Sequence, residues 1–387
     1  MRDVFIIGTG TVHFGRYPHL LLEDFAGDAV REALGDSGVS RDEIDMAVFS
    51  HSNGGRVAGQ RVLRELSLTG MPILNVENAC AGGGTSLHVG WMGVASGLHD
   101  VALVVGMEKM EKGLIPANPG EYEAFLGKTL PAKYALRASR HMQTYGLTTE
   151  QLAMVSVKNH HAGALNPIAH YQEEVTLQQV LDSRPVADPL TLLQCCPTTD
   201  GAAAVIIASA EVTFRGGRNP VRIAASVLKS GIYRNPTKDS SASDDDLAER
   251  AGKSAYEMAG ISPSDIDVAE VHDAFTIGEI LAYENLGFCA RGEGGKLVEE
   301  GVTALGGRLP VNTSGGRLSM GHPLGATGVA QVVELTRQLQ GRSGARQVEG
   351  ATTALAHVQG GSTPGIGTGA AAVHILTTEP YDTHDAD

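Results

Sequence analysis

Two stretches of the chain show the same succession of an amphipathic helical pattern, a glycine and a short apolar strand pattern. The first helical pattern, LEDFAGDAVREALGDSG, spans residues 22–38, and the second, DDDLAERAGKSAYEMAG, spans residues 244–260. Each ends at a glycine, which suits the left-handed conformation of a helix C-cap. The strand patterns DMAVFS and DVAEVHD follow. The pattern therefore predicts one helix–turn–strand unit that occurs twice.

The two units also match residue by residue. Residues 37–52 and 259–274 align at a shift of 222 residues, and the Ile-Asp pairs ending at Asp45 and Asp267 are among the identities. After each unit come an apolar strand pattern, a polar glycine-rich turn and a further helical pattern. Alternating strands and helices predict largely parallel sheets. We therefore expect an α/β fold built from two related halves.

The halves are placed at residues 1–216 and 217–387. Residues from about 118 to 188 fit neither half, and their helical, locally basic pattern predicts an insertion in the first. The acidic stretch at residues 239–246 is interpreted as a solvated loop and the tail from residue 377 as disordered.

Composition narrows the class of protein. The 387 residues include 44 acidic and 30 basic side chains, and the net charge of −14 argues against nucleic acid as the main partner. Four cysteines, two of them adjacent, do not make a disulfide framework, so we expect reduced thiols in the cytoplasm. The chain opens directly on a strand pattern and has no apolar run of about 18 residues. We therefore expect neither a signal peptide nor a membrane span.

One cysteine stands in an unusual setting. Cys80 lies in NVENACAGGG, between a strand pattern and a helical pattern. Backbone N–H groups at a helix start stabilise a thiolate, and the glycines would let a substrate approach the backbone. A thiolate accepts and releases acyl groups, which favours acyl transfer between thioesters. The alternative is a buried structural thiol, which is our interpretation of Cys195, Cys196 and Cys289.

Two further motifs follow in order, VHDAF at residues 271–275 and GHPLGATG at residues 321–328. With the Cys80 motif and the duplicated pattern, they make the chain resemble the thiolase superfamily, in particular its sterol-carrier-protein-2-type and bacterial thiolase-like members. The resemblance covers nearly the whole chain. It implies two βαβαβαββ halves in a five-layered αβαβα body with a loop domain inserted in the first half, in agreement with the repeat.

The resemblance assigns roles to the motif residues. Cys80 would be the nucleophile, and His322 would take its proton and help to polarise the thioester oxygen. His272 would donate a hydrogen bond to a developing oxyanion. The amide of Cys80 and the backbone of Gly360 and Gly361 would form an oxyanion hole.

Two departures from the family pattern concern a second catalytic cysteine, which moves the proton at the α-carbon. In some relatives this cysteine follows the His-Asp pair, but here Ala274 has that position, and Asp273 is expected to orient a neighbour or cap the next helix. In others it lies in a C-terminal C-x-G motif, but the segment ALAHVQGGSTPGIG has no cysteine. The acid/base group is therefore missing or replaced, and His357 is the nearest candidate.

The other histidines give no sign of a metal site. The insertion carries several of them without ligand spacing to any cysteine or carboxylate cluster. We therefore expect no metal in this chain, and we expect these histidines at the surface: His141, His160, His161 and His170.

The resemblance implies a thiolase that cleaves a 3-oxoacyl-CoA, or condenses two acyl-CoAs, with coenzyme A as a substrate and no bound cofactor. Basic insertion residues could contact its phosphates, or simply form a solvated helix face: Lys128, Lys133, Arg137 and Arg140. The acyl group could be fatty, steroid or aromatic, as in benzoylsuccinyl-CoA. The alternatives are a retro-aldolase acting on a β-hydroxyacyl-CoA and a non-catalytic acyl-CoA-binding subunit.

Assembly is also implied by the resemblance. Family members pair their first-half sheets edge to edge, so we expect a homodimer whose contact hides a strand edge. Several bacterial relatives work with a small partner that has an OB-fold and a zinc ribbon, and the missing cysteine makes such a partner attractive here.

Overall fold

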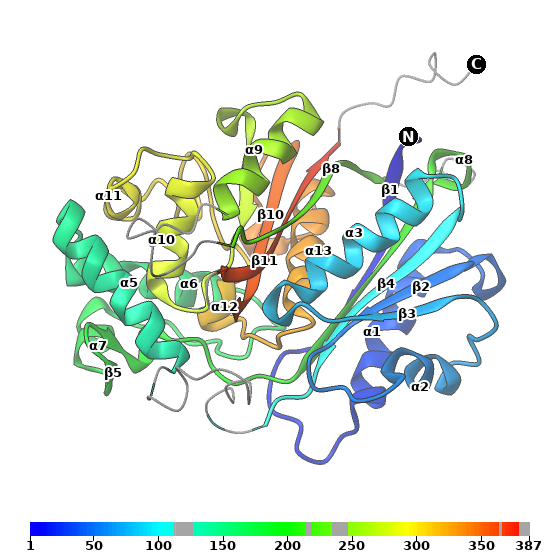
Figure 1. Ribbon diagram of the computed structural model, residues 1–387, viewed down its shortest axis with the longest axis horizontal. Coiled ribbons are helices and arrows are strands. Elements are labelled where there is room, and N and C mark those ends of the chain that lie inside the picture. Colours follow the sequence, from blue (N-terminus) through cyan, green and yellow to red (C-terminus); the bar gives the residue numbers. More distant parts are fainter. Residues whose placement is uncertain are drawn as a thin grey trace.

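Figure 1 shows the computed structural model of the chain, which describes residues 1–111, 113, 127, 129–213, 219–233, 247–363 and 366–378. Several positions named above lie outside the described residues: the start of the insertion at 118, Lys128, the boundary at 216 and 217, the acidic stretch at 239–246 and the tail beyond 378. None of the helices in the described ranges has the length and apolarity that a membrane span needs.

A nine-stranded mixed sheet runs through the described part of the molecule. The prediction of largely parallel sheets is wrong, because only the β2–β3, β2–β4 and β9–β10 ladders are parallel. These strands are joined by helical crossovers, whereas β10 and β11 form a hairpin and the chain reverses direction elsewhere. In spatial order the strands are β3 (Ile73–Val76), β2 (Met46–Ser50), β4 (Val101–Glu108), β7 (Gly201–Ser209), β1 (Val4–Thr11), β8 (Val221–Ser230), β11 (Gly367–Thr377), β10 (Thr353–Thr363) and β9 (Val268–Glu270).

The predicted repeat is present in the structure. In the first half α1 (Leu22–Ser37) ends at Gly38 with φ 63°, and the 3-10 turn η1 (Arg41–Glu43) leads into β2. In the second half α9 (Leu247–Ala259) ends before Gly260 with φ 71°, and the 3-10 turn η5 (Pro263–Asp265) leads into β9. Both glycines adopt the left-handed conformation that a side chain would strain.

The repeated aspartates explain why this part of the pattern occurs twice. Asp45 Oδ2 accepts a hydrogen bond from the backbone N–H of Asp100, just before β4, at 2.9 Å. Asp267 Oδ2 accepts one from the backbone N–H of Thr352, just before β10, at 2.8 Å. In each half the aspartate before one strand therefore holds the start of a neighbouring strand.

The layers follow the expected αβαβα order, with the first-half and second-half strands as the two β layers, which the β1–β8 pairing joins into one sheet. Helices α3 (Gly82–Ala95) and α13 (Thr327–Leu339) pack against each other, and both contact strands of the two halves. They form the central layer seen in the middle of Figure 1. Helices α1 and α2 (Ala58–Glu65) cover the outer face of the first half, and α9 covers β8 and β11 of the second.

The glycines after Cys80 belong to this central contact. A Cβ on Gly83 would lie 2.7 Å from the backbone N of Gly328, and one on Gly84 would lie 2.6 Å from the Cβ of Ala372. These residues therefore let α3 approach α13 and β11. The expectation that they open the backbone to a substrate is wrong, because other parts of the chain fill that space.

The insertion is helical, as predicted, and packs on the second half. Its elements are α5 (Leu130–Tyr145), α6 (Thr149–Ala164), α7 (Leu177–Asp182), β5 (Pro185–Ala187) and β6 (Leu190–Thr191). The remaining helices are α8 (Ala210–Thr213), α10 (Thr276–Asn285), α11 (Gly294–Glu299) and α12 (Gly316–Ser319). Contacts of α5 and α6 with α10, and of α6 with α11 and α12, join the halves.

This packing overturns the surface expectation for two histidines. His141 is 4% exposed and bonds Glu284 Oε1 on α10 at 2.9 Å, and His160 is 3% exposed and bonds the carbonyl of Ser156 at 2.9 Å. His141 faces the second half, and His160 packs against Ser156 of its own helix and the ring of Tyr171. His161 is exposed as expected, whereas His170 is half-buried against Thr199.

Candidate active site

Three separate segments bring Cys80, His272 and His322 together. Cys80 lies in the 3-10 turn η2 (Ala79–Ala81) between β3 and α3, His272 follows β9, and His322 lies between α12 and α13. The Cys80 sulfur and one nitrogen from each histidine lie within 4.8 Å of one another. The two imidazole rings are 5.0 Å apart between centroids. The structure thus joins the three residues that the sequence motifs singled out.

The turn that carries Cys80 has a constrained backbone. Ala79 has φ 49°, in the left-handed region that alanine rarely adopts. The Glu77 carboxylate accepts a hydrogen bond from the Ala79 N–H at 2.6 Å, and the Ala81 N–H donates to the Asn78 carbonyl at 3.0 Å. A conformation of this kind costs about 1–3 kcal/mol and is typical of functional sites. Here it places the Cys80 thiol next to the N-terminus of α3.

His322 is held as the hydrogen-bond acceptor of the thiol. Thr327 Oγ1 donates to the Pro323 carbonyl at 2.9 Å, so it accepts the Nδ1–H of His322 at 2.8 Å. The lone pair of Nε2 then points at Cys80 Sγ, 3.2 Å away. This tautomer allows the thiol proton to pass to Nε2.

Burial decides the resting charge of this pair. It raises the pKa of the Cys80 thiol to about 12, and the charges of Glu108 and Glu77 act in the same direction. It also lowers the pKa of His322 to about 3, with a smaller contribution from the Arg317 charge. The backbone amide at the helix start favours the thiolate, as expected, but burial outweighs it. The resting pair is therefore a neutral thiol and a neutral imidazole.

His272 is a buried neutral imidazole. It is 2% exposed, and burial, followed by the charges of His322, His357 and Arg317, holds its pKa well below the ordinary value. Its Nδ1 has no hydrogen-bond partner among the described residues. The ring can thus offer a hydrogen bond to a group that enters the site.

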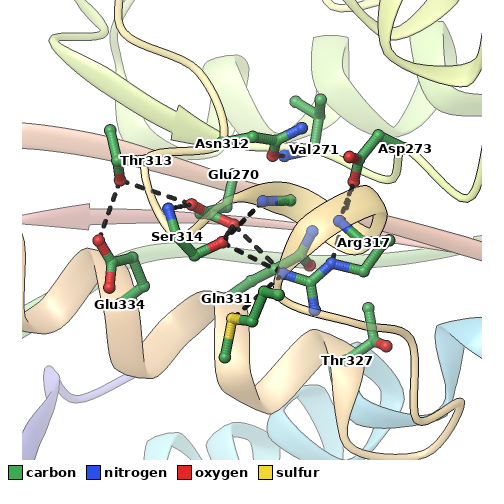
Figure 2. A network of polar contacts seen from close by, with 12 residues as sticks. Glu270, Val271, Asp273, Asn312, Thr313, Ser314, Arg317, Thr327, Gln331 and Glu334 are labelled. Atoms are coloured by element: carbon green, nitrogen blue, oxygen red, sulfur yellow. Dashed lines mark hydrogen bonds and ion pairs between the residues drawn. The ribbon is translucent and has the colours of Figure 1, made fainter. Parts of the chain in front are cut away.

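A buried ionic network supports the two histidine segments (Figure 2). The Arg317 side chain is fully buried, with Nη2 3.5 Å from Glu270 Oε2 and Nε 3.9 Å from Asp273 Oδ1. Asp273 accepts the backbone N–H of Arg317 at 2.7 Å and the amide of Asn159 at 2.8 Å. Asp273 therefore caps α12 rather than the helix that follows it. The network joins the segment of His272 to the helix that precedes His322.

Sequence reasoning singled out Asp273 as a residue that orients a neighbour, but it missed Glu270 and Arg317. Burial raises the pKa of both Glu270 and Asp273, and the Arg317 guanidinium opposes the shift. Glu270 also accepts hydrogen bonds from the backbone and side chain of Ser314, at 2.9 and 2.7 Å (Figure 2). The signal that could have found Glu270 is its place as a charged residue inside an apolar strand pattern.

Of the C-terminal candidates, Gly360 reaches the cysteine turn. A Cβ on Gly360 would lie 2.5 Å from the Cys80 N and 2.6 Å from the Ala81 N. Gly361, with φ 73°, is exposed and has only Gly369 within 4 Å of such a Cβ. His357, on β10, is 1% exposed, and its charge acts on His272.

A second thiol lies near the site. The Cys196 N–H donates to the Ala274 carbonyl at 2.9 Å, so Cys196 adjoins the position where a second cysteine was expected. Burial raises the pKa of Cys196 well above its ordinary value, and the nearby Cys80 charge adds to the shift. Cys195, extended at φ −121° and ψ 138°, instead donates its thiol to the Thr191 carbonyl at 3.3 Å. Because the two cysteines are adjacent in sequence, the sequence did not predict that only Cys196 adjoins the site.

A cleft with three arginines in its lining lies between α5, α10 and β10. Arg137 and Arg140 of α5 line it together with Arg291, Glu284 and Gln359. Gln359 precedes Gly360, the residue that packs on the Cys80 amide. The strand β10 therefore borders both the cleft and the cysteine turn.

Comparison with known families decides the assignment. Residues 4–211 match the thiolase N-terminal domain, and residues 235–377 match the thiolase C-terminal domain-like family. The chain belongs to the thiolase family. The resemblance drawn from the three motifs is therefore confirmed, and the chain is an acyltransferase of the thiolase type that uses coenzyme A as a substrate.

Two relatives and one solved structure are similar over nearly their whole length. An acetyl-CoA acetyltransferase from Methanothermobacter thermautotrophicus is 43% identical, over 97% of this chain and 100% of the relative. The benzoylsuccinyl-CoA thiolase subunit BbsB from Thauera aromatica is 41% identical, over 93% and 95%. The structure of an Ltp2-ChsH2(DUF35) aldolase matches with a TM-score of 0.85 and 26% identity, over 98% and 99%.

Proposed function

We propose that this thiolase cleaves a 3-oxoacyl-CoA, or catalyses the reverse condensation, through an acyl-enzyme on Cys80. The observation that carries the proposal is the 3.2 Å contact between Cys80 Sγ and the lone-pair-bearing Nε2 of His322. The site has a nucleophile, a base and a third group that fixes the base, Thr327, which is the arrangement that covalent acyl transfer requires.

The proposed reaction begins with attack of Cys80 on the 3-oxo carbon. His322 Nε2 takes the thiol proton as the S–C bond forms, because the buried pair is neutral at rest. The neutral His272 donates to the oxygen on which charge develops. The C2–C3 bond then breaks, and its electron pair goes to C2 of the departing acyl-CoA. Coenzyme A finally takes the acyl group: its thiol proton goes to the group that protonated C2, and the departing Cys80 thiolate recovers its proton from His322. The Cys80 and Gly360 backbone donors stabilise the thioester oxygen in this step.

The proton that C2 receives needs an acid, and two residues are candidates. His357 is buried on β10 and acts on His272 through its charge, and Cys196 adjoins Ala274 and interacts with Cys80. A raised pKa suits a thiol that donates a proton. Exchange of the C2 hydrogens of an acyl-CoA with deuterated water separates the two candidates. The variant that removes the acid, His357→Gln or Cys196→Ser, should slow exchange by about 10²-fold, and the other variant should not. Cys195→Ser is the matched control, since that thiol bonds Thr191.

We further propose that the phosphates of coenzyme A lie against the arginines of the cleft. Arg137, Arg140 and Arg291 line the cleft together with Glu284, and Gln359 in the same lining precedes Gly360 on β10. Arginine suits phosphate because its planar donors pair with two oxygens at once.

The acyl group is proposed to be fatty, steroid or aromatic, and the 41% identity to a benzoylsuccinyl-CoA thiolase subunit supports including an aromatic acyl-CoA. We also propose a homodimer through the edge strand β3, whose central residues are exposed. A small OB-fold and zinc-ribbon partner is supported by the DUF35 protein in the similar aldolase complex and by the subunit name of BbsB. The four free cysteines fit the proposed cytoplasmic location.

The alternative is a retro-aldolase acting on a β-hydroxyacyl-CoA, which the structural match to an aldolase favours. Such a reaction does not need an acylated cysteine. The test is a panel of 3-oxoacyl-CoAs and β-hydroxyacyl-CoAs, given to the native chain and to Cys80→Ala, each with and without a candidate partner. Cleavage of 3-oxoacyl-CoA that needs both coenzyme A and Cys80 supports the thiolase. Cleavage of β-hydroxyacyl-CoA by both chains supports the aldolase.

A further inference from the structure

Cys80, His272 and His322 make a compact set of ligand atoms for a soft metal ion. The sulfur and one nitrogen from each ring lie within 4.8 Å of one another, and Cys80 Sγ and His322 Nε2 are 3.2 Å apart. With bonds of about 2.0–2.3 Å, neighbouring ligand atoms of tetrahedral zinc are about 3.3–3.8 Å apart. One pair is already close to this spacing, and a shift of about 1 Å by His272 would complete it.

The two imidazoles are prepared for such an ion. His322 donates its Nδ1–H to Thr327 Oγ1 at 2.8 Å, and metal-bound histidines are usually fixed in the same way. His272 is 2% exposed, yet its Nδ1 has no hydrogen-bond partner among the described residues. Buried polar atoms are nearly always paired, so in the resting site this nitrogen keeps a capacity that no described residue uses.

The charges around the site act in both directions. Glu108 and Glu77 act against a free Cys80 thiolate and Lys133 acts in its favour, while Arg317 acts against a positive charge on both histidines. The nearby positive charge of Arg317 lies between two carboxylates, those of Glu270 and Asp273. Carboxylates that disfavour a free thiolate would stabilise a thiolate bound to a divalent ion.

We propose that Cys80, His272 and His322 bind Zn²⁺ and that the bound ion reversibly blocks the nucleophile. Binding forms a Zn–S bond and breaks the S–H bond. The proton leaves to solvent, because the Nε2 lone pair of His322 is used by the metal. No electron transfer is involved. This proposal goes beyond the proposed function and does not depend on the identity of the acyl substrate.

The sequence prediction of no metal missed this set because its members come from three distant segments without ligand spacing. Cys80 follows β3, His272 follows β9, and His322 precedes α13. Only the fold brings them together, and the three then serve chemistry and metal binding in turn.

The test uses the full chain, first stripped with a chelator, in a buffer with a non-thiol reductant. Calorimetry with Zn²⁺ should show one ion per chain with proton release, and Co²⁺ should give a thiolate-to-cobalt charge-transfer band. Cys80→Ser should lose the band, and His272→Asn should weaken Zn²⁺ binding by at least about tenfold. Cys195→Ser should bind like the native chain, because that thiol is turned towards Thr191. Equal Zn²⁺ affinity in the native chain, Cys80→Ser and His272→Asn would overturn the proposal.

A second measurement needs no variant. Zn²⁺ should protect Cys80 from iodoacetamide in the native chain, as read by mass spectrometry of the peptide, and a chelator should restore labelling. Labelling of Cys80 at the same rate with saturating Zn²⁺ would also overturn the proposal. Failure of the proposed function is seen separately, as the absence of an acyl adduct on Cys80 in metal-free buffer.

Discussion

The two halves share one frame, and they use it differently at the ends of corresponding strands. Ser50 ends β2 in the first half, and its hydroxyl donates to the carbonyl of Gly325 in the loop that carries His322. His272, its counterpart at the shift of 222 residues, follows β9 and enters the site. One strand end holds the loop of His322, and the other supplies a side chain that meets this histidine. Duplication therefore provides the geometry, and divergence of a few residues provides the chemistry.

The largest effect is expected when the thiol of the first half is removed. Cys80→Ala should lower thiolysis by at least about 10³-fold, because no other described thiol contacts His322 Nε2. The measurement is the steady-state cleavage of a matched 3-oxoacyl-CoA, with circular dichroism to show that the fold is kept. Cys195→Ala is the control and should retain near-native turnover. Substantial turnover by Cys80→Ala would exclude covalent catalysis.

Alanine substitutions at the two corresponding strand ends, and at His322, give the next largest effect. His272→Ala and His322→Ala should each slow thiolysis by about 10²-fold or more, because each removes a donor or base that acts at the reacting centre. Ser50→Ala should instead cost about 1–3 kcal/mol of unfolding free energy, because it leaves a buried carbonyl without its donor. Rates and urea unfolding should be measured on all three. A larger rate loss for Ser50→Ala than for His272→Ala would break the proposed division of roles.

The contact between the halves gives a third effect, on stability alone. Gly328→Ala should destabilise the fold by about 3 kcal/mol, because the new methyl group would lie 2.3 Å from the Gly84 N in the opposite helix. Gly35→Ala in α1 is the matched control. No atom lies within 4 Å of its Cβ position, so it should gain about 0.5–1 kcal/mol. Urea unfolding measures both, and changes of the same sign would contradict the assigned packing.

The smallest effect is expected at the aspartates that precede corresponding strands of the two halves. Asp45→Ala and Asp267→Ala each remove an acceptor for the backbone N–H of the residue just before a neighbouring strand. Each should cost about 1–2 kcal/mol of unfolding free energy, with little change in turnover. Unfolding of both variants under the same conditions is the measurement. A cost for one aspartate only would show that the repeat has lost this equivalence.

Sequence reasoning predicted the features that depend on residues close together in the chain. The C-cap glycines follow turn and capping rules, and together with Asp45 and Asp267 they mark the repeated units in the sequence itself. The site residues Cys80, His272 and His322 came from motifs in the family order. The family assignment is confirmed, whereas the catalytic roles of the three residues stay predictions.

The parts that sequence reasoning did not predict depend on contacts between distant segments. Whether two strands run parallel depends on where the chain re-enters the sheet, which local pattern does not show. The prediction of largely parallel sheets was wrong for this reason. His141 is buried because α5 packs on α10 of the other half. Arg317 is buried because Glu270 and Asp273 meet it from another segment. The two candidates for the group that protonates C2, His357 and Cys196, also reach the site only through contacts between distant segments.

The central claim is that Cys80 carries the acyl group, and intact-mass spectrometry tests it directly. The metal-free chain is mixed with a matched 3-oxoacyl-CoA in the absence of free coenzyme A, quenched in acid and mapped by peptide digestion. We predict a mass increase of one acyl group on the Cys80 peptide, which disappears when coenzyme A is added before the quench. Turnover of the same substrate with no acyl group on Cys80, or with the group on Cys195, Cys196 or Cys289, would contradict it.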